Sequence, residues 1–192
     1  MIYCDHHIEK AIRDGRLIVD PPPDASQFDS SSLNLRVGDD FCVWKPSLKA
    51  KGTGHSIELD HIDLAEIIDL TDPLLPNGDG IVLIKPGAFV LVRTFEYISL
   101  PVKSKLAARV EGRSKQARLG LTAHITAPTI HAGFAGKITL EIVNHGPFRI
   151  EIRPNRSQLC QLIIEEVSAV PKRAAALAFS QQATPLGSRR SR

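Results

Sequence analysis

Two segments of the chain combine residue types that can bind phosphate or move protons. The first spans residues 111–120, where Gly112 and Gly120 enclose a hydroxyl and three cations, namely Ser114, Arg113, Lys115 and Arg118. Such a turn offers backbone N–H groups, a helix N-terminus and guanidinium groups to phosphate oxygens. It therefore predicts a polyphosphate site, although a solvated basic helix between two strands explains the same residues equally well.

The second segment, residues 136–144, places a carboxylate in the middle of an apolar strand. Alternation puts three aliphatic side chains on one face, namely Ile138, Leu140 and Ile142. Glu141 falls on the other face with Thr139 and Val143. Because such neighbours exclude water, we expect the pKa of Glu141 to be raised toward the working pH of a general acid–base group. The alternative is a solvent-facing residue of an edge strand, paired with Lys137.

Other catalytic motifs are weak in this sequence. His7 and Glu9 match the His-x-Glu of zinc deaminases, but no Pro-Cys-x-x-Cys follows, and a single histidine cannot hold zinc. We attribute that match to chance. There is no Walker loop and no dinucleotide-binding glycine fingerprint.

Composition and length limit the class of protein. A chain of 192 residues fits one domain, which we place at 1–170 with a flexible tail at 171–192. The net charge is +3, and much of it lies at the last residues, so a nucleic-acid partner is not expected. No apolar run approaches the roughly 18 residues of a membrane helix, and no signal peptide is recognisable. Three distant cysteines favour a reducing cytoplasm over a disulfide framework.

The N-terminal half is predicted to hold a short helix and the first strands. Asp5 is the expected cap of the helix and Gly15 its end. Residues 33–37 alternate like a half-buried strand, with residues 41–44 as its partner. Residues 45–60 read as a loop, followed by a helical turn around 64–68.

The rest of the chain is a series of short strands separated by glycine, proline and asparagine. One or two helical turns are expected at 114–119. The expected strands are 81–84, 88–94, 106–110, 121–125, 137–143, 149–153 and 159–167. Many short strands at this spacing indicate a mainly β sandwich or barrel.

Several of these motifs together resemble the dCTP deaminases, whose wider relatives are the trimeric dUTPases. The resemblance is most specific in residues 112–114, 117–121, 126–127, 132–134 and 136–141. Weaker matches lie at 15–17, 32–38, 86–87, 100–101 and 161–162. It extends to about residue 167.

The resemblance implies a distorted β-barrel or jelly-roll of the dUTPase-like type, with short helices. It also implies a homotrimer with sites at the subunit interfaces and a C-terminal tail that closes over the nucleotide. The implied reaction is zinc-independent deamination of dCTP to dUTP and ammonia. Glu141 would be the general base, while Ser114, Arg118 and the carbonyl of Ala127 would position the water and the amino group.

Substrate contacts follow from the same resemblance. The phosphates would carry Mg2+ and face Arg113 and Ser114. The full set implied to bind substrate is Arg113, Ser114, Lys115, Arg118, His131, Thr139, Gln161 and Gln182.

The chain departs from the family pattern at four places. His131 replaces an aspartate that contacts the sugar and, in dUTPases, orients the attacking water. Lys115 replaces a serine, Cys160 replaces a glycine, and the tail motif is reduced to residues 178–182. The His131 departure argues against a dUTPase mechanism, and three alternatives to the monofunctional deaminase stay open. They are a bifunctional deaminase that forms dUMP and diphosphate, a dUTPase, and a non-catalytic trimeric nucleotide-binding protein.

Overall fold

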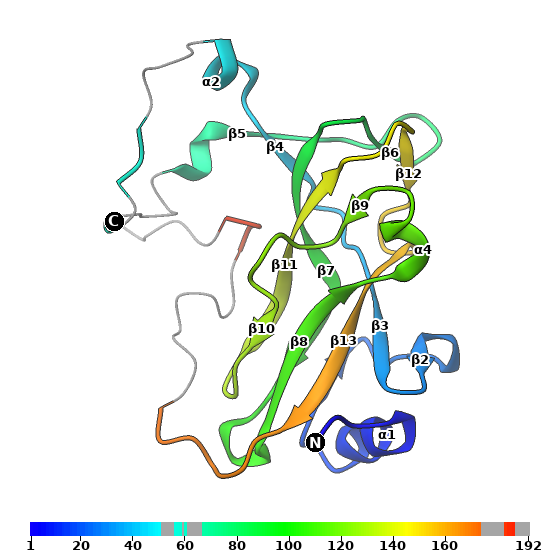
Figure 1. Cartoon of the computed structure of the whole chain (residues 1–192), viewed down its shortest axis with the longest axis vertical. Coiled ribbons are helices and arrows are strands. Elements are labelled where there is room, and N and C mark those ends of the chain that lie inside the picture. Colours follow the sequence, from blue (N-terminus) through cyan, green and yellow to red (C-terminus); the bar gives the residue numbers. More distant parts are fainter. Residues whose placement is uncertain (51–55, 59, 61–66, 174–182, 187–192) are drawn as a thin grey trace.

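Antiparallel strands build most of the described part of the chain, which comprises residues 1–50, 56–58, 60, 67–173 and 183–186 of a computed structural model (Figure 1). Two larger sheets and a two-stranded sheet pack around one apolar core. The mainly β architecture predicted from the spacing of the strands is therefore confirmed.

The first sheet carries the strand of Glu141. Its order is β5 (Thr71–Pro73), β4 (Cys42–Trp44), β7 (Phe89–Ser99), β11 (Ala135–Asn144) and β9 (Leu121–Thr122), with β1 (Ile18–Asp20) also on β7. The long strands β7 and β11 form its centre, and Glu141 pairs there with Leu91.

The second sheet supports the turn of residues 112–120. Its order is β10 (Thr129–Ile130), β8 (Leu106–Gly112), β13 (Gln158–Glu166), β3 (Ser32–Arg36) and β2 (Phe28–Asp29). The two-stranded sheet consists of β12 (Ile150–Ile152) and β6 (Val82–Ile84).

Helices in the described residues are short. They are α1 (Asp5–Arg13), α2 (Pro46–Ala50), α4 (Ser114–Ala117) and the 3₁₀ turns η1 (Ala25–Gln27), η3 (Ile68–Leu70) and η4 (Val102–Ser104). Helix α1 lies at one end of the molecule, at the bottom of Figure 1, and α4 lies toward the other. Within these residues, none of the helices has the length and apolar character needed to cross a bilayer.

A buried charged group joins the two large sheets. Glu96 in β7 is fully buried, and its carboxylate accepts hydrogen bonds from the Nε of Arg36 at 2.7 Å and the backbone N–H of Arg36 at 2.9 Å. Gln27 donates a third at 2.9 Å. Because every oxygen is paired, the carboxylate can stay inside the core without an unsatisfied charge.

The structure corrects three predictions for the N-terminal half. The strand at 32–36 is buried on both faces, including Asn34, because Gln27 covers it and Asn34 donates to Asp29 at 2.8 Å. Strand β4 pairs with β5 and β7 rather than with the strand at 33–37. Residues 46–50 form helix α2 instead of a loop, with Pro46 at the first helical position, where its missing N–H costs nothing.

Two further details concern helix ends. Cys4, not Asp5, is the N-cap residue of α1, and no side chain caps that end. Gly15 follows the helix with a positive φ of 67°, as expected for a residue that ends a helix. The turn predicted around 64–68 lies partly outside the described residues, and η3 begins at Ile68.

Candidate active site

Glu141 lies in the middle of β11, the strand between β7 and β9. Its neighbours Leu140 and Ile142 are fully buried and face the core, so the Glu141 side chain points to the opposite face, where it is half-buried. Glu141 is half-buried rather than fully exposed, but β9 pairs with β11 only at Val143 and Asn144, so among the described residues one strand, β7, is paired with β11 at Glu141. The Lys137 ammonium lies instead over the ring of Phe95, 5.8 Å from its centroid.

Burial and local dipoles act on the Glu141 carboxylate in opposite directions. Burial is the largest influence and raises the pKa of Glu141 above its ordinary 4.5. The backbone N–H of Ile125, a second backbone hydrogen bond and the imidazole of His124 lower the pKa, but less. The predicted direction of the pKa shift is thus confirmed.

His124 is a titratable neighbour that the sequence did not single out. Its Nε2 lies 4.0 Å from Oε2 of Glu111, and its side chain is mostly buried, with 17% exposed. Its Nδ1 is buried and has no hydrogen-bond partner among the described residues. His124 therefore places an imidazole close enough to act on the charge of Glu141.

The turn after β8 is held in place by strand β13. Arg113 is the N-cap residue of α4, and its Nη1 donates a short hydrogen bond to Oε1 of Gln158. Gln116 donates to the carbonyl of Gln158 at 2.8 Å. The helical turns predicted at 114–119 are confirmed as α4, and Gln158 is the residue that fixes their position.

Gln161 ties the start of the same turn to the second sheet. Its Nε2 donates to the carbonyl of Gly112 at 3.1 Å, and its Oε1 accepts from the Ser32 hydroxyl at 3.1 Å. Both ends of the Gln161 amide are therefore engaged within the chain. Gln161 positions the backbone of the turn in this structure.

A pair of glycines lets the end of the turn touch the end of β11. A Cβ on Gly120 would lie 2.4 Å from the backbone nitrogen of Gly146, and one on Gly146 would lie 1.8 Å from the carbonyl oxygen of Leu119. The buried Asn144 completes the contact by accepting from the N–H of Gly146 at 3.0 Å. Only glycine permits this close crossing, because any side chain would overlap backbone.

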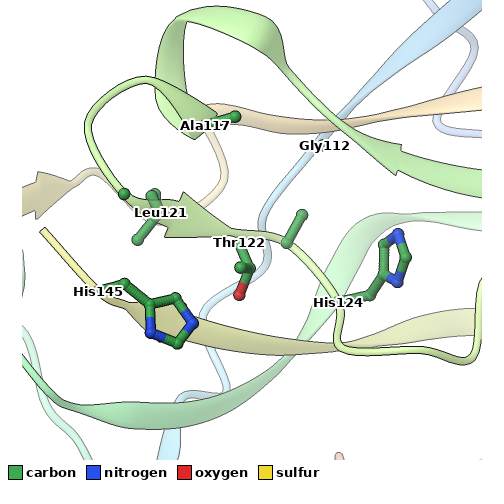
Figure 2. A pocket seen from close by; sticks show the side chains of 8 residues that line it. Gly112, Ala117, Leu121, Thr122, His124 and His145 are labelled. Carbon is green, nitrogen blue, oxygen red and sulfur yellow. The ribbon is translucent and has the colours of Figure 1, made fainter.

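A cavity of 280 Å³ lies between this turn and β9 (Figure 2). Figure 2 shows the imidazoles of His124 and His145 at opposite ends of the cavity, with Thr122 between them. The lining residues are Gly112, Ala117, Gly120, Leu121, Thr122, Ala123, His124 and His145.

Four residues implied by the family pattern lie near these elements but do not touch Glu141. Ser114, Lys115 and Arg118 project from α4 and its end into solvent, without a side-chain hydrogen bond or ion pair among the described residues. Ala127 is exposed in the loop between β9 and β10.

The outer face of β11 carries a short part of the C-terminal tail. The Thr139 hydroxyl donates to the carbonyl of Pro185 at 3.2 Å, and Leu186 is buried. A second cavity, of 550 Å³, lies between residues 183–186 and the β4 region, including Cys42. Cys42 pairs with Leu91, which pairs with Glu141, so this cavity borders the face that carries Glu141.

Two residues that the family pattern implies in substrate binding are not found beside Glu141. His131 lies away from it, and Gln182 is outside the residues that the structure describes. His131 is exposed in the turn between β10 and β11. That turn hydrogen-bonds to Leu100, just after the last residue of β7, whereas Leu91, the partner of Glu141, lies near the first residue of β7. His131 and Glu141 are therefore not in contact, although an extended ligand along β11 could meet both. Gln182 and the tail motif at 178–182 lie outside the described residues.

Comparison with known proteins gives one consistent family. The chain matches the family described as dCTP deaminase-like over residues 2–167. It is 36% identical over 167 residues to a protein of Methanobrevibacter smithii named "dCTP deaminase, dUMP-forming", with 87% of this chain and 81% of that protein covered. It is 32% identical over 201 residues to a Rhodospirillum rubrum "dCTP deaminase", covering 98% and 96%.

A solved structure has the same fold. The 2'-deoxycytidine 5'-triphosphate deaminase of Agrobacterium tumefaciens superimposes with a TM-score of 0.62 at 20% sequence identity, covering 86% of this chain. This chain spans about half the length of that protein, since 48% of it is covered.

Proposed function

The chain belongs to the dCTP deaminase-like family, and on that premise we propose that it is an enzyme that converts dCTP and water to dUTP and ammonia. The 36% and 32% identical relatives carry dCTP deaminase in their names. The reaction serves the supply of dUTP and thus of thymidine nucleotide precursors.

The half-buried carboxylate of Glu141 is the observation that carries the proposal. Water adds to C4 of cytosine as Glu141 takes its proton. Glu141 then passes the proton to the ring nitrogen, the new hydroxyl at C4 gives its proton to the amino group, and the C4–N bond breaks as ammonia leaves and the carbonyl forms. The raised pKa of Glu141 supports both halves of this cycle, because such a carboxylate accepts and returns a proton at small cost.

Ser114, Arg118 and the carbonyl of Ala127 complete the proposed catalytic group. They orient the attacking water and the amino group of cytosine. The solvent-exposed position of Ser114 and Arg118 on the anchored α4 turn supports this role, since both side chains are available to a ligand. The N–H of Val110, which donates to the carbonyl of Pro128 at 2.9 Å, holds the backbone next to Ala127.

The phosphates are proposed to bind at the α4 turn, through Arg113, Ser114 and Lys115, with His131, Thr139, Gln161 and Gln182 as further substrate contacts. Residues 113–120 offer cations and hydroxyl or amide groups but no carboxylate. This donor set fits Mg2+ that is carried by phosphate oxygens rather than held by the protein. When bound, Mg2+ would offset the charge of the triphosphate, and no zinc takes part.

We propose a homotrimer as the active form. The exposed cations of α4 and the open face of Glu141 support sites that a neighbouring subunit completes. Sedimentation analysis of the purified chain would give a mass near three times 21.0 kDa. A monomer that retains full deaminase activity would contradict this assembly.

The decisive experiment measures ammonia release from dCTP, CTP and dCMP by the parent and by Glu141→Gln. We expect a loss of about 10²- to 10⁴-fold with dCTP, the usual effect of removing a general base. Glu151→Gln is the matched control, because Glu151 is an exposed glutamate in β12. Equal deamination by parent and Glu141→Gln would exclude Glu141 as the base, and no deamination by the parent would favour a non-catalytic nucleotide-binding protein.

A bifunctional reaction is the second candidate. Relatives between 35% and 39% identical are named dUMP-forming, whereas those at 30% and 32% are named simply dCTP deaminase. With a second water the bifunctional enzyme would release dUMP, diphosphate and ammonia. Chromatography of the products separates dUMP from dUTP, and rapid diphosphate release from added dUTP would instead indicate a dUTPase.

A further inference from the structure

Three potential metal ligands meet at the start of α1, away from the candidate active site. The Sγ of Cys4 lies 3.3 Å from Nδ1 of His6 and 3.1 Å from Nδ1 of His7. One donor atom from each of the three residues lies within 4.8 Å of the other two. The His6 and His7 rings are adjacent, with centroids 4.2 Å apart.

The backbone on either side fixes this cluster in place. Cys4 is the extended N-cap residue of α1, and both histidines belong to the first turn. The N–H of Tyr3 donates to the carbonyl of Ile164 at 2.9 Å, and Ile8 is fully buried. The three ligands are therefore presented from an anchored segment, with Cys4 partly buried and the histidines exposed.

We propose that Cys4, His6 and His7 form a site for a thiophilic transition-metal ion, with Zn2+ as the best fit and one coordination position open to water. A tetrahedral zinc ion with Zn–S of about 2.3 Å and Zn–N of about 2.0 Å requires S···N separations of roughly 3.5 Å. The separations of 3.1 and 3.3 Å differ from this by a few tenths of an ångström. Small side-chain rotations are enough to admit the ion.

The donor types select the metal. A thiolate with two imidazoles suits zinc and other borderline or soft ions, whereas Mg2+ and Ca2+ prefer oxygen ligands. The Asp5 carboxylate lies 3.4 Å from Nδ1 of His6 and accepts the His6 backbone N–H at 2.7 Å. It adds negative charge beside the ion, and its hydrogen bond to the His6 backbone holds the first turn of the helix in place.

The site is separate from the proposed deamination. Helix α1 lies at the bottom of Figure 1, whereas α4 lies near mid-height on the right and β9 lies above it. A metal there has no direct contact with the groups around Glu141. Its effect is to hold the first turn of α1, so zinc stabilises the folded chain by mass action.

The test titrates the tag-free, full-length protein with Zn2+ by calorimetry, and with Co2+ by absorption. We expect one equivalent to bind, with thiolate-to-cobalt charge transfer and a rise in Tm. Cys4→Ser, His6→Gln and His7→Gln should each weaken binding by at least about 10-fold, the lower bound for loss of a residue that only supports a ligand. Cys42→Ser and His145→Gln are the matched controls and should bind as the parent does.

A second measurement needs no variant. Zn2+ should slow the alkylation of Cys4, followed by peptide mass spectrometry, while Cys42 serves as the internal reference. Equal alkylation of Cys4 with and without zinc, or equal zinc affinity of the parent and Cys4→Ser, would overturn the proposal.

Discussion

The carboxylate of Glu141 is an ionisable side chain that the fold shields from water on one side. Its pKa is raised, so the folded chain holds the proton more tightly than the unfolded chain does. The stabilisation from this group is therefore fully present below its ordinary pKa of 4.5. It is lost as the pH rises through the pKa that Glu141 has in the folded chain. Above that pH the ionised carboxylate is partly desolvated, which lowers the stability of the folded chain.

The effect of the Glu141 charge on the stability of the fold can be measured with Glu141→Gln. We expect the variant to have a higher Tm than the parent at neutral pH, because it removes a partly desolvated charge. The difference should shrink as the pH falls toward 4.5, where Glu141 in the parent is protonated. Calorimetry across this pH range checks it, with Glu151→Gln as the exposed control; a difference independent of pH would contradict the explanation.

His131 is the residue where this chain differs most informatively from its family's pattern. A neutral imidazole can accept a sugar hydroxyl but does so less strongly than a carboxylate. We expect His131→Asp to increase the preference for dCTP over CTP, measured as the ratio of kcat/KM values. His131→Ala separates loss of the imidazole from gain of the carboxylate, and unchanged selectivity in both would remove His131 from the sugar site.

At the scale of elements, the candidate site depends on how the α4 turn is held against its neighbours. Gln158 and Gln161 fix its start to β13, and the crossing of Gly120 with Gly146 fixes its end to β11. The turn is therefore anchored to both large sheets. These contacts set the position of the turn relative to the two sheets.

Gly146→Ala should disturb the position of the turn. Its Cβ would meet the backbone oxygen of Leu119, so the turn must shift, and we expect a loss of about 1–3 kcal/mol in unfolding free energy, typical of overpacking. KM for dCTP should rise as α4 moves. Gly78→Ala is the matched control, because a Cβ at Gly78 meets nothing within 4 Å. Equal denaturation midpoints for the two variants would argue against a tight crossing.

Across the whole molecule, Glu96 connects the two sheets on which the site is built. It belongs to β7, and its partner Arg36 belongs to β3 of the other sheet. A short bridge between Val37 and Thr94 lies beside this pair. The relative position of the sheets, and hence of Glu141 and α4, is therefore set in part by a buried ion pair.

Glu96→Ala should be strongly destabilising. Removing the carboxylate leaves the Arg36 guanidinium, which is 22% exposed, without its partner, and breaking such pairs costs about 3–5 kcal/mol. Urea denaturation would measure the loss. Glu96→Gln, which keeps the shape and one acceptor, should lose less, and Glu151→Ala on the surface should lose under about 0.5 kcal/mol. A Glu96→Ala midpoint equal to that of Glu151→Ala would contradict the link between the sheets.

The sequence alone determined the features that depend on neighbouring residues. Alternation gave the strand of Glu141 and the face on which it lies, and residue type gave the helical turn at 114–117. It also predicted the direction of the pKa shift of Glu141, which burial causes.

Only the tertiary structure decided what depends on contacts between distant segments. Strand β4 pairs with β7 and not with β3, and Asn34 is buried, because partner choice and burial depend on which surfaces pack together. The support of the α4 turn by Gln158 has the same origin. Periodicity gives each strand its faces, but the partner of each face is settled only when the whole core packs.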